Sequence, residues 1–185
     1  FIKNPHEKGF VSFHQDAKYI GLEPYNWVTA WIAITDSNIK NGCMRMWAGS
    51  HKDNLKEHEQ KFNEGNLLTR GQTVKNVPIE KTTPVILKAG QMSLHHPTIV
   101  HGSGINKSND RRIGFVIQSY IGTNVNQVLG KMYVQQARGN DNFKYHEHVE
   151  RAKITMNERN IETRKKAIEE LSKIFYSGSD RKGNF

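Results

Sequence analysis

The sequence predicts a mainly β protein folded as a barrel or a jelly roll. Short segments rich in β-branched and aromatic residues recur along most of the chain, and turn-forming residues separate them. Strands and helices do not alternate in the way that a parallel α/β sheet requires. The 185 residues are enough for one domain with a sizeable core and too few for two.

The first strand signals precede a polar stretch near residue 50. Each segment is rich in apolar, β-branched or aromatic residues and is followed by polar or small turn formers. We expect strands at Phe10–Asp16, Trp27–Asp36 and Cys43–Trp47. Within the first of these, Val11 and Phe13 share one parity, and His14 and Asp16 share the other.

A long polar segment then interrupts the strands. From His51 to Thr83 the chain is weakly periodic and is punctuated by Gly65, Gly71 and Pro78. A loop of this length in a compact domain is usually a lid or a substrate loop.

Strand signals return after this loop. Apolar runs bounded by turn residues predict strands at Val85–Leu87, Met92–His96, Ile99–His101 and Arg112–Ile121.

The end of the chain is predicted to be helical. Apolar residues recur at helical spacing, with charged residues between them, at Ile161, Ile168, Leu171 and Phe175. This pattern predicts an amphipathic helix from Glu158 to about Tyr176, and we expect Tyr145–Met156 to be helical too. The chain would then be a single domain over residues 1–185, with a core at 10–135 and a helical C-terminal tail at about 145–178.

The composition restricts the class of protein. Hydrophobic residues make up 36% of the chain, and no apolar run approaches the roughly 20 residues that cross a bilayer. With Cys43 as the one cysteine, no internal disulfide can form, and we expect a reducing, cytoplasmic location. Cys43 itself is expected to be a small buried hydrophobic residue. The chain starts without an initiator Met or the layout of a signal peptide, so we expect an interior segment of a longer chain.

The net charge of +9 is spread along the chain. Its densest cluster, Arg164 to Lys166, falls on the predicted surface helix, so we interpret most of the excess as a solvated face. Some of it could attract an anionic small molecule. Nucleic acid is not an expected partner, because the sequence contains neither a basic face interleaved with aromatic residues nor a groove-reading helix.

A candidate metal site begins with His14 and Asp16. Residues i and i+2 of a strand point to the same face, about 7 Å apart along the chain. An imidazole and a carboxylate placed side by side, joined by one distant histidine, make a facial triad that leaves positions open on an octahedral Fe(II). On its own, His-x-Asp is more often a surface histidine beside a solvated aspartate.

The segment from Ser93 to Phe115 supplies further candidate groups. It contains several histidines, and Arg112 follows the last of them by eleven residues. The guanidinium fork of arginine matches a carboxylate such as the distal one of 2-oxoglutarate, and the hydroxyl of Ser103 can share it. The alternative for Arg112 is an exposed arginine at a strand end, paired with Asp110.

These residues carry a family resemblance. The stretches FHQDAKYIGL, TAWIAITDSNIKNGCMRMWAGSHK, NLLTRGQ and GQMSLHHPTIVHGSGINKSNDRRIGF together resemble the bacterial branch of the phytanoyl-CoA dioxygenase-like family of iron- and 2-oxoglutarate-dependent oxygenases. The similarity covers roughly Phe10 to Tyr120, and the ARGNDNF stretch at Ala137–Phe143 and the helical tail are similar as well.

The resemblance implies a double-stranded β-helix (jelly-roll) core with C-terminal helices. Family members are usually longer at the N-terminus, so we expect that part of the usual domain to be absent from this sequence. The implied iron ligands are His14, Asp16 and His101. Halogenating relatives replace the carboxylate ligand by a small residue, so the retained Asp16 favours hydroxylation.

The resemblance also implies a cosubstrate site. Arg112 would form a salt bridge with 2-oxoglutarate, Ser103 would assist it, and Trp31 falls where family members place an aromatic residue near the cosubstrate. The implied cofactors are Fe(II), 2-oxoglutarate and O2.

Two other histidines compete for the place of the third ligand. The eleven-residue spacing to Arg112 and the VHGS context favour His101 over both. His96 shares the parity of Met92 and is expected to pack or to support a ligand, whereas His95 either faces the substrate or packs.

Five aromatic and histidine side chains have an open interpretation. Tyr19, Tyr25 and Trp27 either line the mouth of the pocket or pack. His146 and His148 form either a second metal site or a solvated start of the tail helix, and the second interpretation is favoured.

The function predicted from the sequence is hydroxylation of a small molecule, with release of succinate and CO2. Positive charge favours an anionic substrate such as a phosphonate, a carboxylate or an acyl thioester. Alternatives are desaturation, ring closure or epoxidation on the same fold, or a non-catalytic jelly-roll binding module. The sequence does not predict an oligomeric state.

Overall fold

The computed structural model describes residues 1–179 and divides the chain into two compact units. The first unit contains Phe1–Lys18 and Trp27–Tyr120, and the second contains Tyr19–Asn26 and the chain from Ile121 onward. A single dioxygenase domain over the whole chain stays a prediction. Among the described residues, no helix has the length and apolarity to span a membrane.

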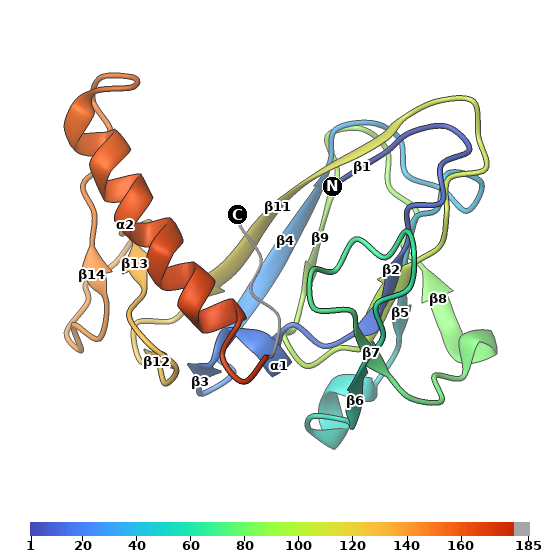
Figure 1. The fold of residues 1–185 in the computed structure, drawn as a ribbon, viewed down its shortest axis with the longest axis horizontal. Helices are drawn as coiled ribbons and strands as arrows, with labels where there is room; N and C mark the ends of the chain where they lie inside the picture. The colour runs from blue at the N-terminus through green and yellow to red at the C-terminus, as the bar shows by residue number, and fades with distance from the viewer. Residues whose placement is uncertain (180–185) are drawn as a thin grey trace. The chain divides into compact units, whose positions relative to one another are not determined.

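Two four-stranded sheets build the first unit, apart from the last residue of β11 (Figure 1). One sheet has the order β1 (Ile2–Lys3), β11 (Arg112–Ile121), β4 (Trp27–Ala33) and β9 (Met92–His95). The other has the order β2 (Val11–His14), β10 (His101–Ser103), β5 (Met44–Trp47) and β8 (Thr82–Pro84). These two sheets confirm the predicted jelly-roll architecture, and neighbours in each sheet are far apart in the sequence.

Alternation along β4 separates the inside of the first sheet from its outside. Trp27, Thr29, Trp31 and Ala33 are buried, as the period of two predicts for one face of a strand. Trp31 and Ala33 form a core cluster with Met44 of the other sheet. The hydrophobic core therefore lies between the two sheets.

The opposite face of the first sheet is apolar as well. Phe115 of β11 is 58% exposed and Leu94 of β9 is 62% exposed. Other apolar side chains of the same face, which we call the outer apolar face, are half-buried or exposed at Ile2, Val28, Ile32, Met92, Ile113 and Ile117.

The polar segment after residue 50 is more ordered than the sequence predicts. It contains the 3₁₀ helices η1 (Ser50–Asp53) and η2 (Ile79–Lys81) and an antiparallel pair of short strands, β6 (His58–Gln60) and β7 (Gln72–Val74). Strands of three residues with mixed polarity leave no periodic signal, so the sequence predicts a long loop where the chain also forms short strands. A role as a lid or substrate loop stays a prediction.

Two predicted strands lie a few residues away from their expected places. Thr82–Pro84 forms β8 where Val85–Leu87 is predicted, and β10 begins at His101 rather than at Ile99. Pro84 fits because β8 is an edge strand, where a missing backbone N–H is tolerated.

The second unit contains two small sheets and one long helix. Strand β3 (Leu22–Glu23) pairs with β12 (Asn126–Gln127), and β13 (Tyr133–Val134) pairs in parallel with β14 (Glu147–His148). The short helix α1 (Ala17–Ile20) crosses the boundary between the units, and α2 (Glu158–Phe175) follows the prediction closely. Asn157 caps α2 through its side chain, which accepts a hydrogen bond from the amide of Asn160.

The predicted helix over Tyr145–Met156 is wrong. Glu147 and His148 pair with β13, and the rest of the segment is irregular. Lys144 and Met156, beside and at the end of it, have positive φ angles of 54° and 58°, which interrupt a right-handed helix.

Candidate metal centre

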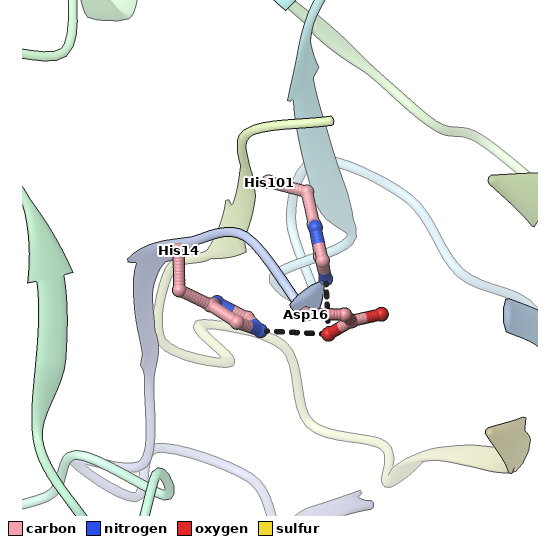
Figure 2. Close-up of side chains that lie close together, drawn as sticks. All are labelled: His14, Asp16 and His101. Carbon is pink, nitrogen blue, oxygen red and sulfur yellow. Dashed lines mark ion pairs between the residues drawn. The ribbon is translucent and has the colours of Figure 1, made fainter. Parts of the chain in front are cut away.

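The sheet containing β2 and β10 brings the predicted triad together. His14 ends β2 and His101 begins β10, and the two residues are direct partners in the antiparallel ladder. Asp16 lies just past the end of β2, although the sequence predicts it within the strand. Its Oδ1 atom is 3.4 Å from Nε2 of His14 and 3.8 Å from Nε2 of His101 (Figure 2). One donor atom from each residue lies within 4.8 Å of the other two.

Backbone carbonyls set the tautomer of both histidines. Nδ1 of His14 donates to the carbonyl of Ser12 at 2.8 Å, and Nδ1 of His101 donates to that of Ile99 at 3.0 Å. A carbonyl only accepts, so the proton of each neutral ring is on Nδ1 and the lone pair is on Nε2. Both lone pairs are therefore on the atoms that face Asp16, as metal ligation requires.

Burial and neighbouring groups hold His101 and Asp16 in the protonation states that bind metal. All three side chains are at most 8% exposed. Burial, with His14 acting in the same direction, lowers the pKa of His101 to about 3, so the ring is neutral at pH 7. Burial alone would raise the pKa of Asp16, but the adjacent imidazoles hold it well below its usual range. A neutral imidazole beside an ionised carboxylate is the ligand set of a divalent cation.

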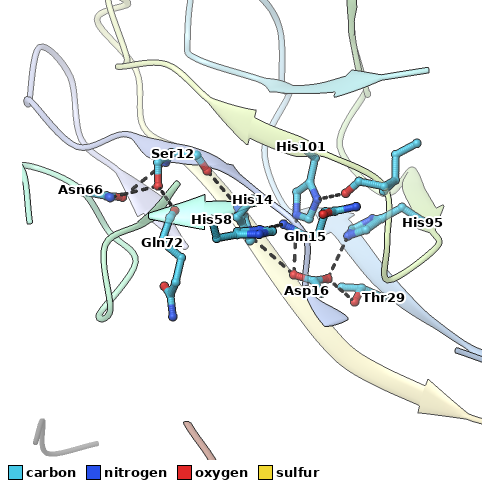
Figure 3. Close-up of polar contacts among 11 residues, drawn as sticks. Ser12, His14, Gln15, Asp16, Thr29, His58, Asn66, Gln72, His95 and His101 are labelled. Carbon is cyan, nitrogen blue, oxygen red and sulfur yellow. Dashed lines mark hydrogen bonds and ion pairs between the residues drawn. The ribbon is translucent and has the colours of Figure 1, made fainter. Parts of the chain in front are cut away.

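The second oxygen of Asp16 has its own partners. Thr29 of β4 donates to Oδ2 at 2.8 Å, and Nε2 of His95 lies 3.5 Å from the same atom (Figure 3). Asp16 thus presents Oδ1 to the two histidines while Oδ2 is held from the other sheet. Such outer contacts orient a carboxylate ligand.

Gln15, between the two predicted ligands, points to other segments and is fully buried. Its Nε2 donates to the carbonyls of Asn54 at 3.0 Å and Thr98 at 2.6 Å, and its Oε1 accepts from the amide of Lys56 at 2.8 Å. The ligand segment is therefore fastened both to the segment after η1 and to the turn before β10.

Arg112 is a buried charged side chain on β11, where this strand pairs with β1. Arg112 is 1% exposed, and its guanidinium carbon is 5.2 Å from the centroid of the Trp31 ring. Its Nε atom has no hydrogen-bond partner among the described residues. The alternative of an exposed arginine paired with Asp110 is therefore wrong. Ser103 has the parity of His101 on β10 and is buried, so both side chains face the interior.

The two competing histidines differ in their surroundings. His95 is buried beside Asp16: its Nε2 lies 3.5 Å from Oδ2 of Asp16, and its Nδ1 has no hydrogen-bond partner among the described residues. His96 instead shares a 2.8 Å hydrogen bond with the hydroxyl of Thr98, and its ring lies near His51. His95 is thus the one of the two that could contact a bound molecule.

The remaining candidates are not part of the triad. Trp27 and Cys43 are buried, and Cys43 interacts electrostatically with Lys3 and Arg112. His146 donates to the carbonyl of Val125 at 2.7 Å, and His148 pairs with Asp141 at 2.7 Å. Within residues 1–179, only His14, Asp16 and His101 form a group of metal-ligand side chains, and they lie in the first unit.

Tyr19 and Tyr25 fall in the second unit, where Tyr19 is buried and Tyr25 is half-buried. Their predicted place at the mouth of the pocket is not tested.

Sequence reasoning missed several residues around the triad. Thr29 had a usable signal, because it shares the buried parity of Trp27 and Trp31 on β4. Lys3 and His58 had none, since their contacts depend on pairings that only the folded chain reveals.

A family model described as phytanoyl-CoA dioxygenase (PhyH) matches residues 1–114 of the chain. The peroxisomal phytanoyl-CoA dioxygenase of Mus musculus is 31% identical over 101 residues, which cover 54% of this chain and 30% of the mouse protein. The chain thus matches less than a third of that relative's length.

Solved structures extend the likeness to nearly the whole chain. A non-heme monooxygenase, ThoJ, in its apo form is 28% identical with a TM-score of 0.82, covering 95% of this chain and 64% of that one. The same enzyme as a nickel complex is 27% identical with a TM-score of 0.72, covering 92% of this chain and 60% of that one. A non-heme α-ketoglutarate-dependent carbocyclase, SnoK, shares the fold at 24% identity and a TM-score of 0.51, over 68% of this chain and 48% of that one.

Proposed function

The chain belongs to the phytanoyl-CoA dioxygenase family of non-haem oxygenases, and from that premise we propose that it is an Fe(II)- and 2-oxoglutarate-dependent oxygenase acting on a small molecule. The observation that carries the proposal is the buried triad, with two Nε2 lone pairs and one carboxylate oxygen on neighbouring segments. Two imidazoles and one carboxylate are the facial ligand set of iron oxygenases.

The triad residues fit a resident Fe(II). His14, Asp16 and His101 would hold the ion on one side, and the burial of their side chains limits access of water. Bound there, Fe(II) would supply the position at which 2-oxoglutarate chelates and O2 is activated, with succinate and CO2 as co-products. ThoJ, which is similar over most of this chain, has also been solved with nickel.

The cosubstrate carboxylate is proposed to lie at Arg112. A guanidinium pairs with a carboxylate through two parallel hydrogen bonds, and Ser103 would add a third donor. Trp31 covers the guanidinium with its indole face, which fixes the plane of the fork.

Hydroxylation is the proposed outcome of the reaction. The carboxylate ligand Asp16 is present, so no position is opened for a halide. The substrate is proposed to be anionic, since the chain carries an excess of positive charge. Desaturation or ring closure depends on where a substrate is held, so product analysis decides between these outcomes.

Substitution of the triad tests the proposal. Anaerobic titration of the Fe(II)-loaded chain with 2-oxoglutarate should give the weak visible band of the chelate, and a panel of anionic metabolites should stimulate succinate formation. In His14→Ala and Asp16→Ala the band and the succinate should both disappear, because the ligand set is incomplete.

A matched histidine–aspartate pair provides the control. His148 and Asp141 contact each other at 2.7 Å in the second unit, so His148→Ala and Asp141→Ala should keep both signals. Full succinate formation in the triad variants would contradict the proposal, as would a wild-type chain that binds neither iron nor 2-oxoglutarate.

A further inference from the structure

Lys3 is a buried cation that lies beside Arg112. The two residues are direct partners in the antiparallel pair β1–β11, and each is 1% exposed. Within residues 1–179, neither forms an ion pair with a carboxylate. Burial, with the neighbouring Arg112 acting in the same direction, lowers the pKa of Lys3 to about 7. Two buried positive groups without a counter-ion are unfavourable unless an anion joins them.

The ammonium of Lys3 reaches from β1 to the other sheet. It donates to the hydroxyl of Ser103 at 2.7 Å, to the carbonyl of Ser103 at 3.4 Å and to the carbonyl of Gly104. An ammonium has three donors and no acceptor, so the hydroxyl of Ser103 accepts in this contact. The proton of that hydroxyl must therefore point to a different partner.

Arg112 offers donors in the same interior. Burial lowers its pKa to about 10, so the guanidinium is charged at pH 7. Ser103 and Arg112 thus present hydroxyl and guanidinium protons between the two sheets, and Lys3, whose three N–H groups already have acceptors, adds its positive charge beside them. Among the described residues, no carboxylate pairs with either cation. This is the donor set that a carboxylate needs.

We propose that Lys3 is a positioning residue of the 2-oxoglutarate site, which fixes the Ser103 hydroxyl as a donor and adds a second positive charge beside Arg112. The proposal rests on the proposed function. Its consequence is selectivity: the site prefers a 2-oxo acid with a distal carboxylate over one that ends in a methyl group. A purely structural role, in which Lys3 only fastens β1 to β10, predicts no such selectivity.

Two cosubstrate probes separate these roles. 2-Oxoglutarate and 2-oxopentanoate have the same carbon chain, but only the first has a distal carboxylate. We would measure the Kd of each on the Fe(II)-loaded, anaerobic chain through the visible band of its chelate, with calorimetry as a second readout. Arg112→Ala serves as the reference for loss of the carboxylate contact.

Lys3→Met should weaken 2-oxoglutarate roughly 10- to 100-fold, as expected for lost hydrogen bonds to a charged group, and should leave 2-oxopentanoate nearly unchanged. Ser103→Ala combined with Lys3→Met should cost less than the sum of the single changes, because Lys3 acts partly through Ser103. Lys88→Met is the control, since Lys88 is an exposed lysine paired with Asp36 at 2.8 Å, and its selectivity should equal that of the wild type.

Each result decides the matter. If the Lys3 variants bind both acids equally more weakly, or bind both as the wild type does, the proposal is overturned and Lys3 has only a structural role. If Lys3→Met fails to bind iron, Lys3→Gln keeps an N–H donor for Ser103 and removes the charge, and a smaller loss of selectivity in the same direction is expected. A wild-type chain with no 2-oxoglutarate band refutes the proposed function itself, whereas a wild-type band with unchanged selectivity in the Lys3 variants refutes only this inference.

Discussion

His58 supports the ligand segment through a single protonation state. Its Nδ1 donates to the carbonyl of Lys56 at 2.8 Å, and its Nε2 accepts from the amide of Gln15 at 3.2 Å. Burial lowers the pKa of His58 to about 4, and the nearby His14 contributes in the same direction. The neutral ring is therefore required, since a proton on Nε2 would face the N–H of Gln15.

Acid should destabilise the metal-free chain over a defined range. The pKa of His58 is about 4 in the folded state and about 6.5 in an unfolded chain, so the unfolded state binds the proton first as pH falls. The stability that the neutral ring provides is present above pH 6.5 and is lost as pH falls toward 4. Urea unfolding of chelator-treated protein at pH 7, 5.5 and 4.5 measures this loss.

His58→Gln keeps an acceptor without a titrating group. This variant should lose less stability over the same pH range than the wild type. His101, with its pKa of about 3, makes the free energy of unfolding fall with pH in both proteins. If the free energy of unfolding depends on pH equally in the wild type and in His58→Gln, then His58 does not contribute to the loss of stability in acid.

At the scale of single residues, the sequence predicts the triad well and its support poorly. His14, Asp16 and His101 were predicted from spacing and family resemblance, and the structure brings them together. Thr29 holds Asp16 from β4, and Lys3 contacts Ser103 from β1. Only the packing of the sheets and the pairing of β1 with β11 reveal these contacts.

At the scale of elements, β11 shows how a strand can present a cation beside an indole ring. Arg112 and Gly114 share the inward parity, and a Cβ atom at Gly114 would lie 2.0 Å from Cζ2 of Trp31. The indole thus lies directly on the strand backbone, where it also covers Arg112. Glycine at this position is a packing requirement.

Gly114→Ala should displace Trp31 and lower the free energy of unfolding by about 1–3 kcal/mol, the usual cost of overpacking. Urea denaturation followed by tryptophan fluorescence measures both effects. Gly9→Ala is the control, because its Cβ would lie 3.7 Å from the side chain of Leu67 at ordinary contact distance, and a change within about 0.5 kcal/mol is expected. An unchanged stability of Gly114→Ala would mean that Trp31 can move at no cost.

Element prediction succeeded where the pattern is long and regular. Strand β11 and helix α2 match their predicted ranges closely, because ten or more residues repeat one period. The predictions for Val85–Leu87 and Tyr145–Met156 failed, since pairing with β5 begins at Thr82 and pairing with β13 replaces a helix.

At the scale of the first unit, both faces of one sheet are apolar. One face forms the core with the other sheet, and the outer apolar face is exposed over β9 and β11. Contiguous exposed apolar surface of this kind is uncommon on monomeric proteins, and it tends to bind apolar molecules or to aggregate.

Charge placed on the outer apolar face should reduce the binding of apolar molecules and the aggregation of the protein without unfolding the chain. Phe115→Lys combined with Leu94→Lys should lower the fluorescence of a bound apolar dye and the light scattering of concentrated protein. Both positions are more than half exposed, so circular dichroism should stay unchanged. Ile154→Lys, at a 66% exposed position in the second unit, should change none of these signals. Unaltered dye binding in the double variant would contradict the prediction.

The pairing of β2 with β10 also concerns the order of events in folding. His14 and His101 are partners across a closure that spans most of the strand-forming sequence, and such distant closures form slowly because chain entropy is lost before contacts compensate for it. The triad is complete only when this pairing has formed, so we expect a partly folded chain without it to lack the full set of ligands. A metal ion bound by the triad would link β2 to β10 and slow the separation of these two strands. Metal binding at the triad is therefore expected to slow unfolding of the chain as well as to support its activity.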